Sequence, residues 1–240
     1  AGDGIGGMPR ALEEALPVGD EAPMFDYAAW GPLEDESFRD RKHDLNLELA
    51  AAEPSRQIDA RLALARFHFA SGHAAEAMGW LQHALRDAPW LEDEPGIKAL
   101  RGASNLLMGR NAEARADLFD PVFDLSREIR LWRGLWLADN GDMVAAYQAF
   151  LASGEAPSSY PKRVSQRAAL FAGEAAARAG DIGKAHDILD SLRLDRPSGA
   201  VLEEVEYVRA LTYAAAGETG EALVRLRNAA NAENRLVRAK

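Results

Sequence analysis

The sequence predicts an all-α protein built from helical hairpins stacked side by side, and three observations lead to this fold class. Apolar residues recur every three to four positions through most of the 240-residue chain, as they do along one face of a helix. No stretch alternates apolar and polar residues with a period of two, so no β-strand is expected. Glycines that can end a helix recur at intervals of 32 to 39 residues, at Gly72, Gly109, Gly141, Gly180 and Gly217.

Residues 58–89 show the hairpin most clearly. Two amphipathic stretches are separated by a short connection that contains Gly72, and glycine accepts the left-handed conformation that ends many helices. A connection of this length makes the two helices antiparallel neighbours. Because neither helix covers its apolar face alone, each hairpin needs another hairpin beside it.

A spaced pattern of small and bulky residues marks this hairpin and returns four more times. Each copy has a small residue seven positions before the turn glycine and an alanine five positions after it. The positions are Ala65, Gly72, Ala77, Leu81, Ala84 and Pro89; Gly102, Gly109, Ala114 and Leu118; Gly134, Gly141, Ala146 and Phe150; Gly173, Gly180, Ala185 and Leu189; and Ala210, Gly217, Ala222, Leu226 and Ala229.

This pattern resembles the tetratricopeptide repeat (TPR), a helical hairpin with a period of about 34 residues. The resemblance covers residues 58–231 and implies a right-handed α-solenoid of about five TPR-like hairpins, preceded by a degenerate N-terminal hairpin. The chain resembles a segment of a bacterial multi-repeat protein of this family. The resemblance therefore implies a non-catalytic scaffold that binds a protein or peptide partner, within a larger bacterial assembly.

The N-terminal residues differ in composition from the repeats. Residues 1–40 hold ten acidic and two basic residues, and prolines and glycines interrupt the first part of the chain. We therefore divide the chain into an acidic Pro/Gly-rich arm, residues 1–35, and the solenoid, residues 36–240. The apolar residues from Met24 to Leu33 are expected to pack against the N-terminal repeats, because large aromatic side chains need a dry surface. They would either cap the stack or occupy the groove in place of a partner.

The remaining helices follow from the same periodicity and from the residues that break it. A helix over residues 37–53 is expected to pair with the Phe25–Trp30 segment as the degenerate hairpin. Pro121 is expected to end or kink the helix that begins at residue 112. The breaker cluster at residues 154–161 predicts a hinge. Further helices are expected at residues 96–108, 112–123, 127–140, 143–152, 162–179, 182–194, 199–216 and 218–230.

Charge and composition argue against several classes of function. A net charge of −10 repels nucleic acid and anionic membranes. There is no cysteine, so disulfides and thiol chemistry are excluded. No run reaches the roughly 18 apolar residues of a membrane span. The 23 arginines against 5 lysines favour a bacterial source. The compartment is left open between the cytoplasm and the periplasm, with the periplasm slightly preferred. The oligomeric state is left open.

No motif for catalysis, a cofactor or a metal stands out. The five histidines lack the spacing of helical metal ligands, and His68 is expected to be a packed core residue. Residues 2–7 contain G-x-G-x-x-G, but no strand precedes them, so we expect no nucleotide site there. The protein is therefore not expected to be an enzyme. Catalysis at an unrecognised site is the third hypothesis, after a scaffold and a carrier of a hydrophobic small molecule.

The resemblance implies that the first helix of each hairpin lines the binding groove. The candidate lining residues are Leu62, Arg66, Phe69, Leu106, Leu131, Leu135, Leu170, Tyr207 and Leu211. Arg66 is the only cation among them, so a clamp for a C-terminal carboxylate is not expected. Either superhelical closure buries these residues, or they form a groove for an apolar helix, a peptide or a lipid-like ligand. The alternative function is thus a carrier of a hydrophobic small molecule or lipid.

Overall fold

The computed structural model describes residues 23–32, 37–154, 159–192 and 199–230, and these residues contain helices and no strands. The α-helices are α1 (Tyr27–Trp30), α2 (Phe38–Ala51), α3 (Gln57–Ala70), α4 (Ala74–Asp87), α5 (Pro95–Leu107), α6 (Asn111–Leu118), α7 (Arg127–Asp139), α8 (Met143–Ser153), α9 (Lys162–Arg178), α10 (Ile182–Ser191), α11 (Gly199–Ala215) and α12 (Thr219–Ala230). Three 3₁₀ helices connect them, η1 (Pro54–Arg56), η2 (Pro89–Asp93) and η3 (Pro121–Phe123). The predicted all-α class is confirmed.

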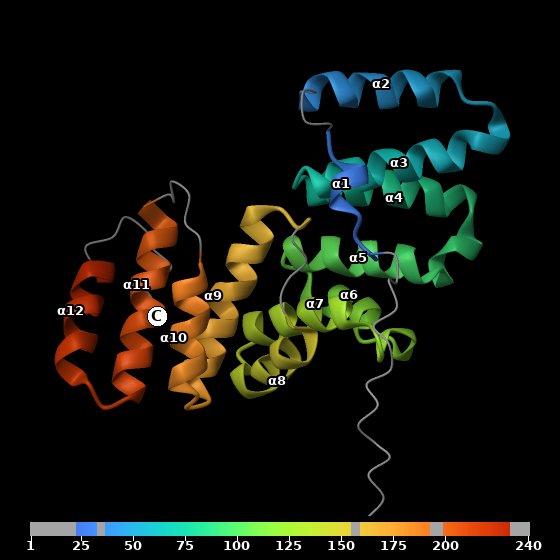
Figure 1. Ribbon diagram of the computed structural model, residues 1–240. Coiled ribbons are helices and arrows are strands. Elements are labelled where there is room, and N and C mark those ends of the chain that lie inside the picture. The colour runs from blue at the N-terminus through green and yellow to red at the C-terminus, as the bar shows by residue number, and fades with distance from the viewer. Residues whose placement is uncertain (1–22, 33–36, 155–158, 193–198, 231–240) are drawn as a thin grey trace, which may run out of the picture.

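Consecutive helices form five hairpins, α3/α4, α5/α6, α7/α8, α9/α10 and α11/α12. The first helices of neighbouring hairpins also contact one another, from α3 through α5, α7 and α9 to α11, and we call these five helices the inner row. Figure 1 shows that α2 to α6 run across the view while α9 to α12 run up and down it. The helix direction therefore rotates along the stack, and α7 and α8 lie at the change.

The turn glycines have the conformation that their spacing predicts. All five have positive φ angles, from 73° at Gly109 to 88° at Gly72. In the first turn, the His73 backbone N–H donates to the carbonyl of His68, and the Gly72 N–H donates to that of Phe69. These bonds use carbonyl groups that the end of α3 leaves without helical partners. A side chain at Gly72 would need a left-handed backbone that only glycine adopts readily.

In three of the repeat patterns, a glycine lies under the bulky residue sixteen positions later. A Cβ atom added at Gly102 would come within 2.9 Å of the Leu118 side chain. One added at Gly134 would come within 2.7 Å of the Phe150 ring. The pattern therefore encodes the close crossing of the two helices in a hairpin, where a bulky side chain fills the space above a residue without one.

Helix α6 stops at Leu118, before Pro121, as the sequence predicts. Pro121 then begins η3, where its missing N–H and fixed φ are tolerated. The Arg133 guanidinium of α7 donates to the carbonyls of Leu118 and Asp120, at 2.7 Å and 3.0 Å. The Arg133 side chain thus provides hydrogen-bond donors for carbonyl groups that the early end of α6 leaves without helical partners.

The prediction that the Phe25–Trp30 segment pairs with the helix of residues 37–53 as a degenerate hairpin is wrong. Helix α1 packs on α3, and α2 packs on α3 through a separate cluster. In that cluster Leu45 meets Leu64 and Phe67, while the ring of Phe38 stacks on Phe67 at 5.0 Å between centroids. A single turn of helix has too little apolar surface to cover α2, so each element docks separately on the larger face of α3.

The predicted hinge at residues 154–161 lies partly outside the described residues, which omit 155–158. Gly154, with φ of 72°, ends α8. Tyr160, at the far end, is 5% exposed and belongs to the same hydrophobic cluster as Phe25 and Ala185. The core is therefore continuous across this segment, and a hinge there stays a prediction.

His68 is packed in the core beside α2, as predicted, but its Nδ1 atom is buried without a hydrogen-bond partner. Burial lowers the pKa of its imidazole, and the charges of Lys42 and His73 lower it further against the opposing effect of Glu76. The unfolded chain, with a His pKa of about 6.5, then binds more protons than the folded chain. Stability should consequently fall as the pH decreases through and below about 6.5.

This pH dependence is tested by replacing His68 with phenylalanine. The melting temperature of the wild type should fall more steeply between about pH 7.5 and pH 5 than that of His68→Phe. The exposed His83, changed to glutamine, is the matched control and should keep the wild-type slope. Parallel slopes for the wild type and His68→Phe would contradict the assignment.

Candidate functional site

A cluster of aromatic rings lies where the N-terminal segment Met24–Trp30 meets the inner row. Phe25 is fully buried, and its ring lies 5.4 Å from that of Phe69 on α3 and 5.2 Å from that of Trp132 on α7. Tyr160, just before α9, completes the cluster with its ring 6.3 Å from Phe25. Three segments distant in the sequence thus surround one side chain, and the predicted packing of Met24–Trp30 is confirmed. Leu33 lies outside the described residues.

Two further side chains of the N-terminal segment contact this cluster. The ring of Tyr27 lies 5.6 Å from Phe69 and 4.7 Å from Tyr160, and only 6% of Tyr27 is exposed. The Arg66 guanidinium lies 5.7 Å from the centre of the Trp30 ring, within the range of a cation–π contact. Burial raises the pKa of Tyr27, so its hydroxyl is protonated at neutral pH. That hydroxyl is buried without a hydrogen-bond partner.

A single carboxylate holds the backbone of the N-terminal segment. Glu128, in the first turn of α7, accepts the backbone N–H of Met24 at 2.6 Å and that of Phe25 at 3.3 Å. It also accepts the Tyr160 hydroxyl at 2.6 Å, and that hydroxyl in turn accepts the Trp132 indole N–H at 3.1 Å. Burial and the charge of Glu128 raise the pKa of Tyr160, so the hydroxyl stays a donor.

The start of α9 reaches back to the first hairpin beside this cluster. The Arg163 guanidinium lies over Gly72, where an added Cβ atom would be 1.2 Å from its Nη1 atom. The same Nη1 is 3.5 Å from the carbonyl oxygen of Ser71. A positive charge is favourable there, because the C-terminal end of α3 carries the negative end of the helix dipole. The α3–α4 turn and the start of α9 therefore meet next to the docked segment.

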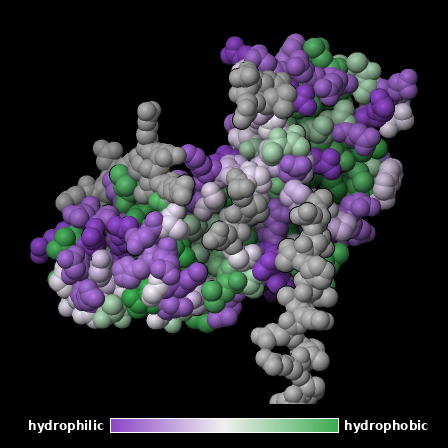
Figure 2. Space-filling view, viewed as in Figure 1, coloured by the Kyte–Doolittle hydropathy of each residue, from purple (hydrophilic) through white to green (hydrophobic). Residues whose placement is uncertain are grey.

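The structure buries seven of the nine predicted groove residues in its cores. These are Leu62, Phe69, Leu106, Leu131, Leu135, Leu170 and Tyr207, while Arg66 and Leu211 are half-buried. The space-filling view agrees, since hydrophobic residues on the face shown form small patches separated by hydrophilic ones (Figure 2). Of the nine predicted residues, Phe69 and Arg66 contact the N-terminal segment Met24–Trp30. Glu128, Trp132, Tyr160 and Arg163 were not predicted as site residues.

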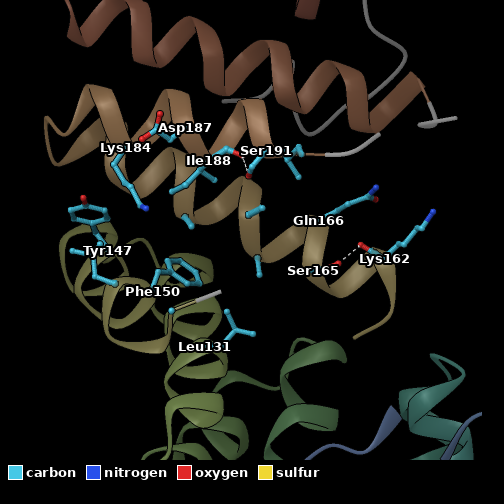
Figure 3. A pocket seen from close by; sticks show the side chains of 16 residues that line it. Leu131, Tyr147, Phe150, Lys162, Ser165, Gln166, Lys184, Asp187, Ile188 and Ser191 are labelled. Atoms are coloured by element: carbon cyan, nitrogen blue, oxygen red, sulfur yellow. Dashed lines mark hydrogen bonds between the residues drawn. The ribbon is translucent and has the colours of Figure 1, made fainter. Parts of the chain in front are cut away.

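A second candidate site is a cleft of about 860 Å³ between the α7/α8 and α9/α10 hairpins. Its apolar lining includes Leu131 and Phe150 on one side and Ile188 on the other (Figure 3). Its polar lining includes Lys162, Ser165, Gln166, Lys184, Asp187 and Ser191. Lys162 and Lys184 come from different helices, so the cleft has a positive group toward each end.

Within the described residues, no three histidines or acidic side chains lie close enough together to hold a metal ion. None of the helices found there has the length and apolar character needed to cross a lipid bilayer. No protein-family model matches the sequence, and comparison with curated proteins and with solved structures gives no significant match.

Proposed function

We propose that this chain is a right-handed TPR-like solenoid that acts as a non-catalytic scaffold and binds a short segment of a protein partner. The proposed site is the surface made by Phe69, Glu128, Trp132 and Tyr160, which we call the aromatic site. The positive-φ turn glycines of the five hairpins and the close helix crossings at Gly102, Gly134 and Gly173 support the solenoid. Stacked hairpins of this kind present a long surface on which function depends on side chains and not on the fold.

One observation carries the proposal, namely that the aromatic site already holds a short stretch of chain. Glu128 accepts two consecutive backbone N–H groups of that stretch, and the aromatic residues pack around its Phe25 side chain. Backbone hydrogen bonds give affinity for any extended chain, and side-chain pockets give specificity. The site thus has both elements of peptide recognition.

The chemistry of the site also defines which groups a partner would offer. A carboxylate that accepts N–H groups binds a backbone or an amine and repels acidic groups. Aromatic walls favour aromatic side chains, each of which buries roughly 150–250 Å². We therefore expect a segment with aromatic residues and with two neighbouring backbone N–H groups that can donate to Glu128.

Photo-cross-linking tests this function directly. Arg66 lies on α3 beside Trp30 of the N-terminal segment. A photoreactive residue placed at position 66 should capture a partner from an extract of the native cells. Mass spectrometry of the cross-link should map it to one short contiguous segment of that partner. A photoreactive residue at the exposed Gln82 on α4 is the matched control and should not capture that segment. Equal capture at both positions, or none at Arg66, would contradict the proposal.

The cleft between the α7/α8 and α9/α10 hairpins supports a second candidate function, a carrier of a hydrophobic small molecule. Its volume falls in the range of small-molecule sites, and an apolar lining with a few polar groups is typical of them. A fluorescent fatty acid should bind the wild type, and Ala169→Trp should abolish binding by filling the cleft. Gly79→Ala, on the exposed face of α4, is the control. Unchanged binding by Ala169→Trp would contradict this candidate.

A further inference from the structure

We propose that residues Met24–Trp30 are an internal ligand that occupies the aromatic site, and that the partner presents a short segment of the same chemistry which displaces it. That chemistry is an apolar residue, an aromatic residue next to it and a second aromatic residue two positions further on, as in Met24, Phe25 and Tyr27. This inference rests on the proposed function and adds the class of partner and the means of regulation.

The first argument is that the site holds the segment in place. Helix α1 has only four residues, and a helix of one turn is unstable in water by itself. Its neighbours Met24 and Phe25 donate their backbone N–H groups to Glu128, which follows them by more than a hundred residues. The segment thus depends on the site for its conformation, as a bound peptide does.

The second argument is that the hairpins do not need the segment to pair. The five hairpins are closed by their own turns and helix crossings, and α2 docks on α3 through the separate cluster of Phe38, Leu45 and Phe67. Each hairpin also contacts the next through the inner row. Loss of the segment therefore exposes one aromatic surface and leaves the remaining contacts in place.

The third argument is that the internal ligand fits the site imperfectly. Tyr27 is 6% exposed, and its hydroxyl has no hydrogen-bond partner. Burying a hydroxyl without a partner costs free energy that phenylalanine at the same position would not cost. The segment therefore binds less tightly than the site permits, and a better-fitting segment can replace it.

The fourth argument concerns the contacts that close beside the segment. Tyr160 bonds to Glu128, which also holds Met24, and Arg163 lies on the turn at Gly72. Both residues belong to the start of α9 or directly precede it. Exchange of the internal ligand for a partner segment thus alters the junction between the first hairpin and α9.

The test cuts the tether after folding. A protease recognition sequence is inserted between residues 34 and 35 of the full chain, and the probe is a fluorescent peptide spanning residues 22–32. Before cleavage, the tethered segment competes with the peptide at an effective concentration of about a millimolar. Cleavage removes this competition. The peptide should bind the cut protein, after removal of the released fragment by gel filtration, about 100-fold more tightly than the uncut protein.

Two variant peptides test the chemistry of recognition. The Tyr27→Phe peptide should bind the cut protein several-fold more tightly than the parent, since it lacks the unpaired hydroxyl. The Phe25→Ser peptide should not bind, because it lacks the side chain at the centre of the cluster. Equal binding of all three peptides, or equal binding to cut and uncut protein, would overturn the proposal.

A second form of the protein covers the case in which the cut chain precipitates. The full-length double variant Phe25→Ser, Tyr27→Ser leaves the tether intact and empties the site, so it should stay helical and bind the parent peptide. A double variant that unfolds, or that stays folded without binding the peptide, shows the segment to be part of the core and overturns the proposal. Cross-linking at Arg66 separates the two claims, because a captured partner with no peptide binding leaves the proposed function standing.

Discussion

Replacing Trp132 by alanine should lower the free energy of unfolding by about 3–5 kcal/mol, the largest effect we expect from a single substitution. Trp132 is fully buried at the middle of α7, where it contacts Phe25 and Phe69. The change leaves a large cavity and removes the indole N–H that the Tyr160 hydroxyl accepts. Urea denaturation followed by circular dichroism measures the loss.

Trp90 is the matched control for this substitution. It is 66% exposed in η2, so Trp90→Ala should change the free energy of unfolding by no more than about 0.5 kcal/mol. Trp132→Phe should fall between the two, because it keeps an aromatic ring and loses the hydrogen bond. Equal losses for Trp132→Ala and Trp90→Ala would show that the aromatic cluster does not contribute to stability.

The sequence predicts the hairpins well because their signals are local. A turn glycine such as Gly141 ends one helix and begins the connection to the next, and its positive φ follows from residues within one turn. The crossing of Gly134 with Phe150 lies within one hairpin and recurs at the same spacing in others. Local, repeated patterns of this kind determine the helices and their pairing within hairpins.

The aromatic site depends on contacts that no local pattern reveals. Met24 and Glu128 are 104 positions apart, and Phe25 and Tyr160 are farther apart still. Glu128 lies in the first turn of its helix, where an acidic residue is ordinary on electrostatic grounds alone. The spacing of Trp132 and Trp136 was visible in the sequence, yet nothing in it shows which of them faces Phe25.

The predicted groove lining shows where inference from a family pattern stops. The first helices do form one row, but residues on them such as Leu106 and Leu135 are buried in the same hydrophobic cluster as Phe25. Most of the apolar residues that were predicted to line the groove are therefore part of the core of this chain. A binding surface has to be sought where polar and aromatic groups converge, as they do around Glu128.

Replacing Gly134 by alanine should lower the free energy of unfolding by about 1–3 kcal/mol, although alanine is the better helix former. The added Cβ atom would lie 2.7 Å from Cε1 and 2.8 Å from Cδ1 of Phe150. That ring is 7% exposed and packed inside the α7/α8 hairpin, so relief requires the two helices to move apart.

Gly79 provides the opposite case within the same fold. It lies in α4, where an added Cβ atom would meet nothing within 4 Å. Gly79→Ala should therefore raise the free energy of unfolding by about 0.5–1 kcal/mol, through helix propensity alone. The two substitutions are chemically identical, so a difference in sign isolates the crossing contact. If thermal unfolding shows both variants stabilised, the close approach of α7 and α8 at Gly134 is wrong, and with it the spacing rule that links each small residue to its bulky partner.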